Sequence, residues 1–219
     1  MKLSKRLEAI YNCIPANALI ADIGSDHAYI PCSYILNNKG TKAYACELRD
    51  GPLDNAKQTI LANNLINSVI PVKSNGLENL PLDVDTIIIA GMGYDTIKHI
   101  LEAYPNKLMN LKNIIVQSNK NVDLIRTWIS DHNYTITNEA IVNDSFFYEI
   151  ITFNLDHHDK LTKEECYFGL NLNDHPEFKL MWNERLNILK EILDGLDPAH
   201  AKYSEILEEI KLIEIELII

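Results

Sequence analysis

The sequence predicts an α/β fold: a doubly wound, Rossmann-like sheet with a reversed last strand, followed by a C-terminal α-helical hairpin. Three observations lead to this fold class. Strand-like and helix-like segments alternate along the first part of the chain. Two strand-like segments then follow each other without a helix between them. From residue 156 onward, apolar residues recur at helical spacing. We therefore expect two domains, residues 1–155 and 156–219.

Five segments are expected to form the parallel strands of the sheet. Each is short and rich in apolar or β-branched residues, which is typical of strands covered by helices on both faces. The expected strands are residues 18–24, 42–47, 69–73, 84–90 and 113–117.

Helical patterns lie between these strands. Pro52 suits a helix start, where a proline sacrifices no hydrogen bond. Pro105 disfavours helical backbone at the residue before it, so a helix should end at residue 104. Asn121 is a suitable N-cap. The expected helices are residues 29–38, 52–65, 95–104 and 121–132.

The end of the sheet is expected to be an antiparallel hairpin. Residues 134–142 and 146–155 are strand-like, and only three residues separate them. A connection this short joins antiparallel neighbours, because a parallel pair needs a long crossover. Nicotinamide-binding Rossmann domains normally end on parallel strands. A reversed last strand resembles instead the plan of S-adenosylmethionine (SAM)-dependent methyltransferases.

The C-terminal residues are expected to form two amphipathic helices with a coiled-coil-like seam. Residues 195–198 separate two apolar runs. Two readings stay open: the hairpin braces the first domain, or it is an arm that guides a substrate. The seam residues are Trp182, Leu186, Leu189, Leu193 and Leu196, then Tyr203, Ile206, Ile210, Ile213 and Leu217.

The charge of the chain limits its partners. The net charge is −11; residues 156–219 carry 15 acidic and 7 basic residues, or −8, and residues 1–155 carry −3. An acidic chain is a poor general binder of nucleic acid, because Lys and Arg supply most of that affinity. An RNA substrate would need a local basic patch, and Lys2, Lys5 and Arg6 are the candidates. A solvated helix face is the alternative reading of these three residues.

The sequence favours a cytoplasmic protein without a membrane segment. Its N-terminus alternates charged and apolar residues, unlike a signal peptide, and its longest apolar stretches are only of strand length. The four cysteines show no metal-binding or disulfide pattern, so we expect reduced thiols. His157, His158 and Asp159 lack a partner motif, and no metal site is expected.

Five of the eight glycines closely follow strand ends: Gly24, Gly51, Gly76, Gly91 and Gly93. In open α/β sheets, ligands bind beyond the carboxyl ends of the strands. Glycine lets the backbone approach a ligand closely and tolerates positive φ. These glycines therefore predict a ligand site at that edge of the sheet.

The loop after the first strand favours a cationic ligand. It holds the single glycine Gly24 between Asp22 and Asp26, whereas a pyrophosphate needs close backbone approach at several points. The carboxylates argue against NAD or FAD and suit the sulfonium group of SAM. Asp22 could alternatively organise the loop, and Asp26 could cap a helix.

The later strand ends supply further candidates for the cofactor. Glu47 could accept both ribose hydroxyls, or could pair with Arg49. Asn75 and Gly76 could accommodate an adenine ring, or form only a turn. Met92, between Gly91 and Gly93, would lie beside the transferable methyl group, or could fill the core.

The fifth strand ends in Gln117, Ser118 and Asn119. The amides of Gln117 and Asn119 could read the edge of a base, although turn formation explains the same residues.

Four motifs resemble those of the TrmK family of bacterial tRNA (adenine-22) methyltransferases, which modify ring nitrogen 1. They are LSKRLEAI at 3–10, ADIGSDHAYIP at 21–31, NGLE at 75–78 and AGMG at 90–93. Two positions depart from the family pattern: Tyr94 follows AGMG where a glycine is usual, and Ser118 replaces the proline of Gln-Pro-Asn. Both lie where the target base should enter.

The resemblance implies SAM as cofactor and tRNA as partner, for a monomer without an obligate protein partner. It implies that Asp26 stabilises developing positive charge and that His27 and Tyr29 shape the pocket. Tyr29 or Tyr94 would stack on the extruded base. The RNA contacts would come from Lys5, Arg6, Tyr94, Gln117 and Asn119. The competing readings are a SAM methyltransferase with another RNA or non-RNA substrate, and a non-catalytic module that binds SAM or RNA.

Overall fold

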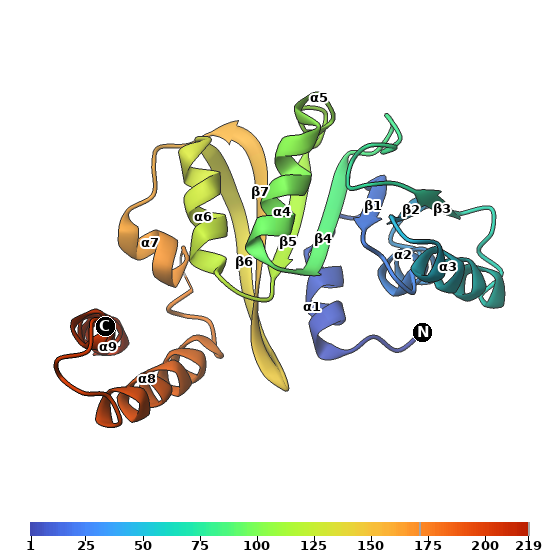
Figure 1. Ribbon diagram of the computed structural model, residues 1–219. Coiled ribbons are helices and arrows are strands. Elements are labelled where there is room, and N and C mark those ends of the chain that lie inside the picture. Colours follow the sequence, from blue (N-terminus) through green and yellow to red (C-terminus); the bar gives the residue numbers. More distant parts are fainter. Residues whose placement is uncertain (171, 219) are drawn as a thin grey trace. The chain divides into compact units, whose positions relative to one another are not determined.

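The computed structural model describes residues 1–170 and 172–218, and the chain divides into two compact units, Met1–Leu170 and Asn171–Ile219 (Figure 1). The expected boundary at residue 155 falls inside the last strand of the sheet, and the first unit continues for fifteen residues beyond it. Each unit is described below by itself.

The first unit contains a seven-stranded sheet with the order β3-β2-β1-β4-β5-β7-β6. The first five strands are parallel, and β7 is antiparallel to both of its neighbours, β5 and β6. The predicted fold class, with a reversed last strand, is confirmed. The strands are β1 (Ile20–Ile23), β2 (Ala43–Glu47), β3 (Val69–Lys73), β4 (Thr86–Met92), β5 (Asn113–Ser118), β6 (Tyr134–Asp144) and β7 (Phe146–His157).

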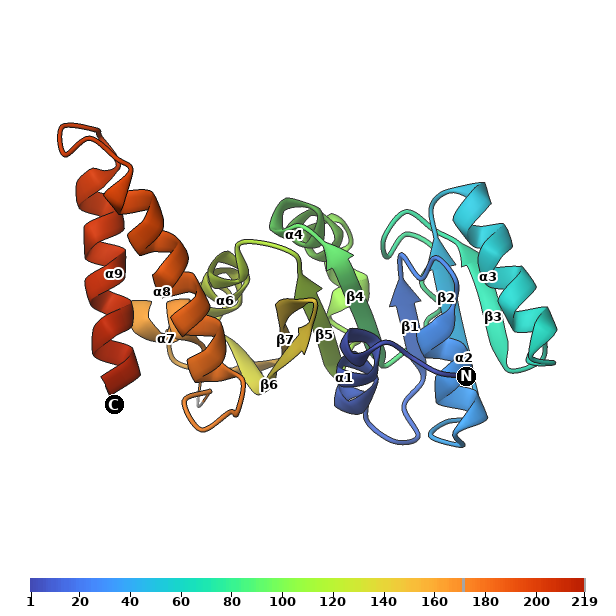
Figure 2. The ribbon, with the colours of Figure 1, turned by 90° about the horizontal axis from the view of Figure 1, so that it is seen from below.

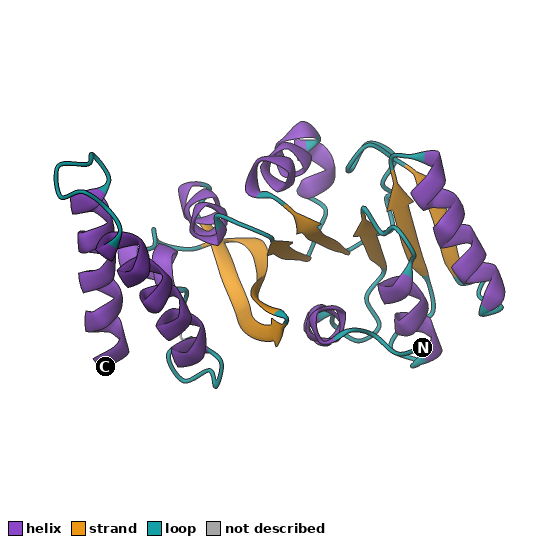
Figure 3. Ribbon diagram, turned by 60° about the horizontal axis from the view of Figure 1, so that its bottom comes forward, coloured by secondary structure: helices purple, strands orange, loops and turns teal. Residues whose placement is uncertain are grey.

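Helices cover both faces of this sheet (Figure 3). Buried residues of α1, α2 and α3 form one core cluster, and those of α4, α5 and α6 form the other. In Figure 2, α1 and α4 lie on opposite sides of β4 and β5. The helices of the first unit are α1 (Lys5–Cys13), α2 (Tyr29–Leu36), α3 (Asp50–Ala62), α4 (Tyr94–Ala103), α5 (Pro105–Leu108), α6 (Val122–Asp131) and α7 (Lys163–Phe168).

The alternation of side chains along the central strands divides the core between the two faces. Ile87 and Ile89 of β4 belong to the cluster under α4 and α6, while Ile88 belongs to the cluster under α1 and α2. All three are fully buried. This explains why the parallel strands are apolar at every position, since neither face meets water.

Two local expectations differ from the structure. Pro105 does not only end α4; it is also the first residue of the short helix α5, a position that suits proline because its missing N–H would have no helical partner. Asn121 occupies the N-cap position of α6, but it has a φ of +56° and its side chain makes no capping hydrogen bond.

The second unit contains α8 (Phe178–Asp194) and α9 (Tyr203–Ile218), which run in opposite directions (Figure 2). Arg185–Glu209 and Lys190–Glu214 ion pairs of 2.7 and 2.6 Å join the two helices. The predicted helical hairpin is therefore present, and the coiled-coil character of its seam stays a prediction. The buried helix residues are Phe178, Trp182, Leu186, Leu189, Ile210 and Ile213. Of the helices that the structure describes, none combines the length and the apolar character of a membrane span.

Candidate active site

The loop after β1 begins the candidate site at the carboxyl edge of the parallel strands. Gly24 has a φ of +75°, which glycine adopts without strain. The backbone N–H groups of Gly24 and Ser25 donate to Cys46 O at 2.9 and 3.2 Å, and so tie the loop to the end of β2. The expected ligand edge thus has a fixed backbone geometry.

Met92, the last residue of β4, lies over this loop. A Cβ atom at Gly24 would overlap Met92 Cε, so space as well as backbone conformation requires glycine there. Met92 also packs against the core cluster beneath α4 and α6. Its placement is compatible with both expected readings, a site residue and core filling.

Glu47, at the end of β2, holds the backbone of two loops. Its carboxylate accepts hydrogen bonds from Asp26 N at 2.7 Å and Leu48 N at 3.1 Å. Glu47 is 8% exposed, and within the described part of the chain no ion pair joins it to Arg49. Because its charge is met only by backbone amides, this carboxylate retains the capacity to accept hydrogen bonds from a ligand.

Asp22 is a buried acid beside Glu47. Ser25 Oγ donates to Asp22 Oδ2 at 2.8 Å, so the carboxylate does organise the loop, through a side chain rather than through backbone amides. Burial raises the pKa of Asp22 to about 7; Glu47 raises this pKa further, while Ser25 and Arg6 lower it. A cationic ligand would favour the charged form of Asp22.

A cavity of about 210 Å³ opens beside these carboxylates. It brings together six of the predicted residues from three segments of the chain. Four more residues line it that the sequence did not indicate. The lining residues are Arg6, Leu7, Asp22, Gly24, Ser25, Asp26, His27, Tyr29, Ile30 and Ala90.

The side chains of Asp26, His27 and Tyr29 stand at the open side of this cavity. His27 and Tyr29 stack with ring centroids 5.2 Å apart, and His27 Nε2 lies 3.7 Å from Asp26 Oδ2. Tyr29 is 41% exposed. The alternative reading of Asp26 as a helix cap is wrong: Ala28 is the N-cap of α2, and no side chain caps that helix.

Arg6 points into the site and does not belong to an exposed basic face. Arg6 Nη1 donates to Gln117 Oε1 at 2.7 Å, and the guanidinium lies 5.4 Å from the ring centre of Tyr148. Its backbone N–H donates to Asp144 Oδ2 at 3.0 Å. Lys5 remains exposed on α1. The helix α1 therefore contributes a cation to the cavity wall and a second cation to solvent.

The amides at the end of β5 bind the loop that follows β4. Gly91 N donates to Gln117 Oε1 at 3.1 Å, and Gln117 Nε2 donates to Asn119 Oδ1 at 3.1 Å. Asn119 Nδ2 donates to Gly91 O at 2.8 Å. Gln117 is fully buried, so its position does not support the expected reading of a base edge. Both amides instead fix the backbone around Gly91, whose φ is +75°.

The remaining predicted residues lie outside the cavity wall. Asn75 accepts a hydrogen bond from Glu78 N at 3.1 Å through its carbonyl, and Gly76 has a φ of +56°, so both form a turn after β3. Gly93 is the N-cap of α4. Tyr94, the first residue of that helix, packs partly buried against the core. Gly51 lies in α3 with no heavy atom near its missing Cβ.

Sequence reasoning missed Lys120, Ser25, Tyr148 and Asp144. Lys120 is exposed, and its Cε lies 3.3 Å from the position that a Cβ atom on Gly93 would occupy. The part of the chain that the structure describes offers Lys120 no ion pair. Its place directly after Asn119 at a strand end was an available signal. Tyr148 and Asp144 gave no signal, because their contacts with Arg6 bridge distant parts of the sequence.

A protein-family model described as tRNA (adenine(22)-N(1))-methyltransferase, TrmK, matches residues 20–215. The chain belongs to the TrmK family. The tRNA (adenine(22)-N(1))-methyltransferase of Bacillus subtilis is 38% identical over 175 residues, which cover 79% of this chain and 71% of the relative.

Solved structures agree with this membership. TrmK from M. capricolum, in complex with S-adenosyl-homocysteine, is 32% identical with a TM-score of 0.88; the match covers 99% of this chain and 98% of that one. A putative tRNA (m1A22) methyltransferase from Streptococcus pneumoniae, in complex with S-adenosyl-L-methionine, is 30% identical with a TM-score of 0.90, covering 99% and 100%. SAM is thus the cofactor of this TrmK methyltransferase fold.

Proposed function

We propose that this TrmK chain transfers a methyl group from SAM to nitrogen 1 of adenine 22 in tRNA. The observation that carries the proposal is the cavity at the carboxyl edge of the sheet, where Asp22, Gly24 and Asp26 face the loop after β4. The family membership supports both the donor and the substrate.

The chemistry of the site fits a cationic cofactor. Asp22 and Glu47 are buried near each other, and each raises the cost of ionising the site. SAM supplies an electrophilic methyl group on a positively charged sulfur. We assign Asp22, Gly24 and Glu47 to holding it, with Gly91, Met92 and Gly93 along its methyl-bearing side. Asn75 and Gly76 form the turn after β3, where an adenine ring could rest.

The target nitrogen needs no general base before attack, because nitrogen 1 of adenine carries a lone pair. The site must orient this lone pair along the line of transfer and must disfavour water there. Methylation makes the adenine cationic, and a proton then leaves its exocyclic amine. Asp26 is placed to stabilise that positive charge, since its carboxylate is at the open side of the cavity and its backbone is held by Glu47.

The target base must leave its stacked position to reach the cavity. Tyr29 suits this step because it is exposed, aromatic and held by the stacked ring of His27. The tRNA itself would contact the exposed cations near the cavity, Lys5 on α1 and Lys120 after β5. Tyr94 is less accessible, because it packs against the core.

The same proposal places the enzyme in the cytoplasm as a monomer. The support is that all residues lining the cavity come from one unit of a single chain. Light scattering of the purified protein, alone and with tRNA, measures the oligomeric state directly.

Methyl transfer to unmodified tRNA tests the function. Purified chain, isotopically labelled SAM and a tRNA transcript with A22 are expected to yield 1-methyladenosine at position 22, located by mass spectrometry of nuclease fragments. A transcript with guanine at position 22 is the control and should remain unlabelled. Label at another position would indicate a different substrate. Binding of SAM without any transfer would support the non-catalytic alternative.

A further inference from the structure

A buried cluster of three charged side chains lies in the first unit, away from the cavity. Arg126 on α6 is fully buried. Its Nε donates to Glu139 Oε1 on β6 at 2.7 Å, and its Nη2 donates to Glu149 Oε1 on β7 at 2.6 Å. The cluster thus connects one helix with the two strands of the terminal hairpin.

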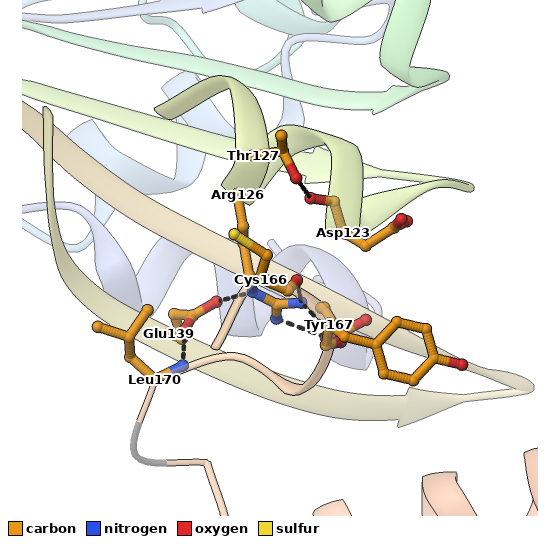
Figure 4. Close-up of polar contacts among 8 residues, drawn as sticks. Asp123, Arg126, Thr127, Glu139, Cys166, Tyr167 and Leu170 are labelled. Atoms are coloured by element: carbon orange, nitrogen blue, oxygen red, sulfur yellow. Dashed lines mark hydrogen bonds and ion pairs between the residues drawn. The ribbon is translucent and has the colours of Figure 1, made fainter. Parts of the chain in front are cut away.

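The same cluster binds the backbone of the residues that close the first unit (Figure 4). Arg126 Nη1 lies 3.4 Å from Cys166 O and 3.5 Å from Tyr167 O, at the end of α7. The second carboxylate oxygen of Glu139 accepts a hydrogen bond from Leu170 N. Leu170 is the last residue of the first unit, so these contacts reach its boundary.

Further hydrogen bonds tie the preceding residues to the end of α6. His158 N donates to Asn133 O at 2.9 Å, and Leu161 N donates to Ser130 Oγ at 2.9 Å. Thr162 and Glu165 form a capping box that starts α7. We call residues 158–170 the exit segment. It is held along its length by polar contacts, and Phe168 is the residue of α7 that is buried.

Stability of the fold does not by itself explain the cluster. A buried ion pair is expensive to desolvate, and apolar residues of similar volume often stabilise as well or better. Ile125, Trp128 and Ile129 already pack α6 against the core. What Arg126 adds is a set of directed donors for backbone carbonyls, which no apolar side chain supplies.

We infer that Arg126 is a positioning residue for tRNA methylation, because it fixes the exit segment from which the C-terminal helices start. The inference rests on the proposed function and on contact between those helices and tRNA. A fixed start restricts the freedom of α8 and α9 before tRNA binds. Less conformational entropy is then lost on binding, so the affinity for tRNA rises without any new contact.

The test removes all three charges together, so that no buried charge loses its partner. In the full-length triple variant Arg126→Met, Glu139→Leu, Glu149→Leu, apolar packing replaces the cluster while the contacts to residues 166–170 are lost. We expect faster hydrogen exchange at the Leu170 amide, unchanged SAM affinity, and a KM for tRNA raised at least about fivefold. The kcat at saturating tRNA should change less than about twofold.

A double variant is the matched control. Lys190→Met with Glu214→Leu removes an ion pair inside the second unit and leaves the exit segment untouched. It should keep the wild-type KM for tRNA and the wild-type exchange rate at Leu170. An equal rise of KM in both variants would overturn the inference, because any lost ion pair would then have the same effect.

Other outcomes are also decisive. A triple variant with fast exchange at Leu170 and an unchanged KM would show that the cluster only holds the fold together. Should the triple variant not fold, Arg126→Lys and Glu139→Gln replace it; an unchanged KM in both overturns the inference. The wild type in the same assay tests the proposed function separately. If it binds tRNA without methylating it, the dissociation constant takes the place of KM, and if it does not bind tRNA, the inference falls as well.

Discussion

At the residue scale, the carboxylates of the site differ in what surrounds them. Asp22 is buried and meets a serine hydroxyl, Glu47 meets two backbone amides, and Asp26 stands at the open side of the cavity. Three acids of one sequence neighbourhood therefore have three different tasks: raising the demand for a cation, fixing the loop, and facing the reacting base.

Asp22→Asn is expected to stabilise the protein in a pH-dependent way. The pKa of Asp22 is raised to about 7 in the folded state and is about 3.9 when unfolded, so the folded state binds more protons between these values. Stability from this group therefore falls as the pH rises from about 4 to 7. Urea unfolding at pH 8 should show a gain on the order of 2 kcal/mol, which shrinks at pH 5. A gain of equal size at both pH values would assign another cause.

The same substitution should weaken SAM binding, because the asparagine cannot offset the cofactor's positive charge. Calorimetry at pH 8 measures this loss, and stability and affinity should move in opposite directions. Unchanged affinity in the stabilised variant would remove Asp22 from the cofactor site.

Asp26→Asn is expected to lower kcat strongly while KM for tRNA changes little. The asparagine keeps the shape of the side chain but removes the charge that faces the methylated base, and a group acting mainly in the transition state affects kcat. We expect a loss of about 100-fold or more, as for other electrostatic stabilisers. Turnover within a few-fold of wild type would place the charge stabilisation elsewhere.

Lys120→Gln is expected to weaken tRNA binding and leave SAM binding unchanged. Lys120 is exposed beside Gly93 and would neutralise one phosphate, so the slope of log KM against log salt should fall by about one. Lys112→Gln is the matched control, because Lys112 precedes β5 at its other end and pairs with Asp85 at 3.4 Å. Equal effects of both variants would indicate a general loss of charge.

At the scale of elements, the sequence predicted what local patterns determine. The five parallel strands are continuous apolar runs, and the reversed strand follows from a connection too short for a crossover. Order within the sheet could not be predicted, because nothing local places β7 between β5 and β6. Pro105 was understood as a stop signal only, although proline suits a helix start equally well.

The candidate site was predicted less completely for the same reason. The glycines and carboxylates at strand ends carry their own signal, so the cavity contains Asp22, Gly24 and Asp26 as expected. The inward position of Arg6 depends on Gln117, 111 residues later in the chain. The extension of the first unit to Leu170 depends on Arg126, whose partners lie on β6, β7 and α7.

One element-scale prediction concerns the contact between α1 and the tip of the β6–β7 hairpin. Asp144 Oδ2 accepts a hydrogen bond from Arg6 N, which starts the helix that carries Arg6 into the site. Asp144→Ala should reduce methylation about threefold to tenfold, the effect of a displaced positioning group. Asp144→Asn keeps an acceptor oxygen and should retain most of the activity. Equal losses in the two variants would show that the charge of Asp144, and not this hydrogen bond, matters.

At the scale of the whole molecule, the two units divide the task. All cavity residues belong to the first unit. The second unit is acidic: residues 171–219 carry 11 acidic and 5 basic residues, or −6. General attraction of phosphate by this unit is therefore excluded, and its contribution must come from local contacts.

Removal of residues 171–219 is expected to leave SAM binding nearly intact and to reduce tRNA methylation strongly. The cut follows Leu170, so the exit segment keeps its hydrogen bonds. Calorimetry with SAM and methylation kinetics with tRNA measure the two effects separately. A truncated chain that methylates tRNA at the full rate would show that the hairpin only braces the enzyme. Loss of SAM binding would instead show that the first unit needs the second to stay folded.

The position of β7 also determines when the enzyme can become active during synthesis. β7 is the last strand to leave the ribosome, yet it occupies an inner place between β5 and β6. Until residues 146–157 emerge, β5 has no antiparallel neighbour and β6 cannot join the sheet. Helix α1, which packs on β6 and β7, must also wait, although it is made first. The nascent chain therefore cannot place Arg6 at the cavity until nearly three quarters of the protein has been translated, and an unfinished chain cannot act on the tRNAs that serve the ribosome producing it.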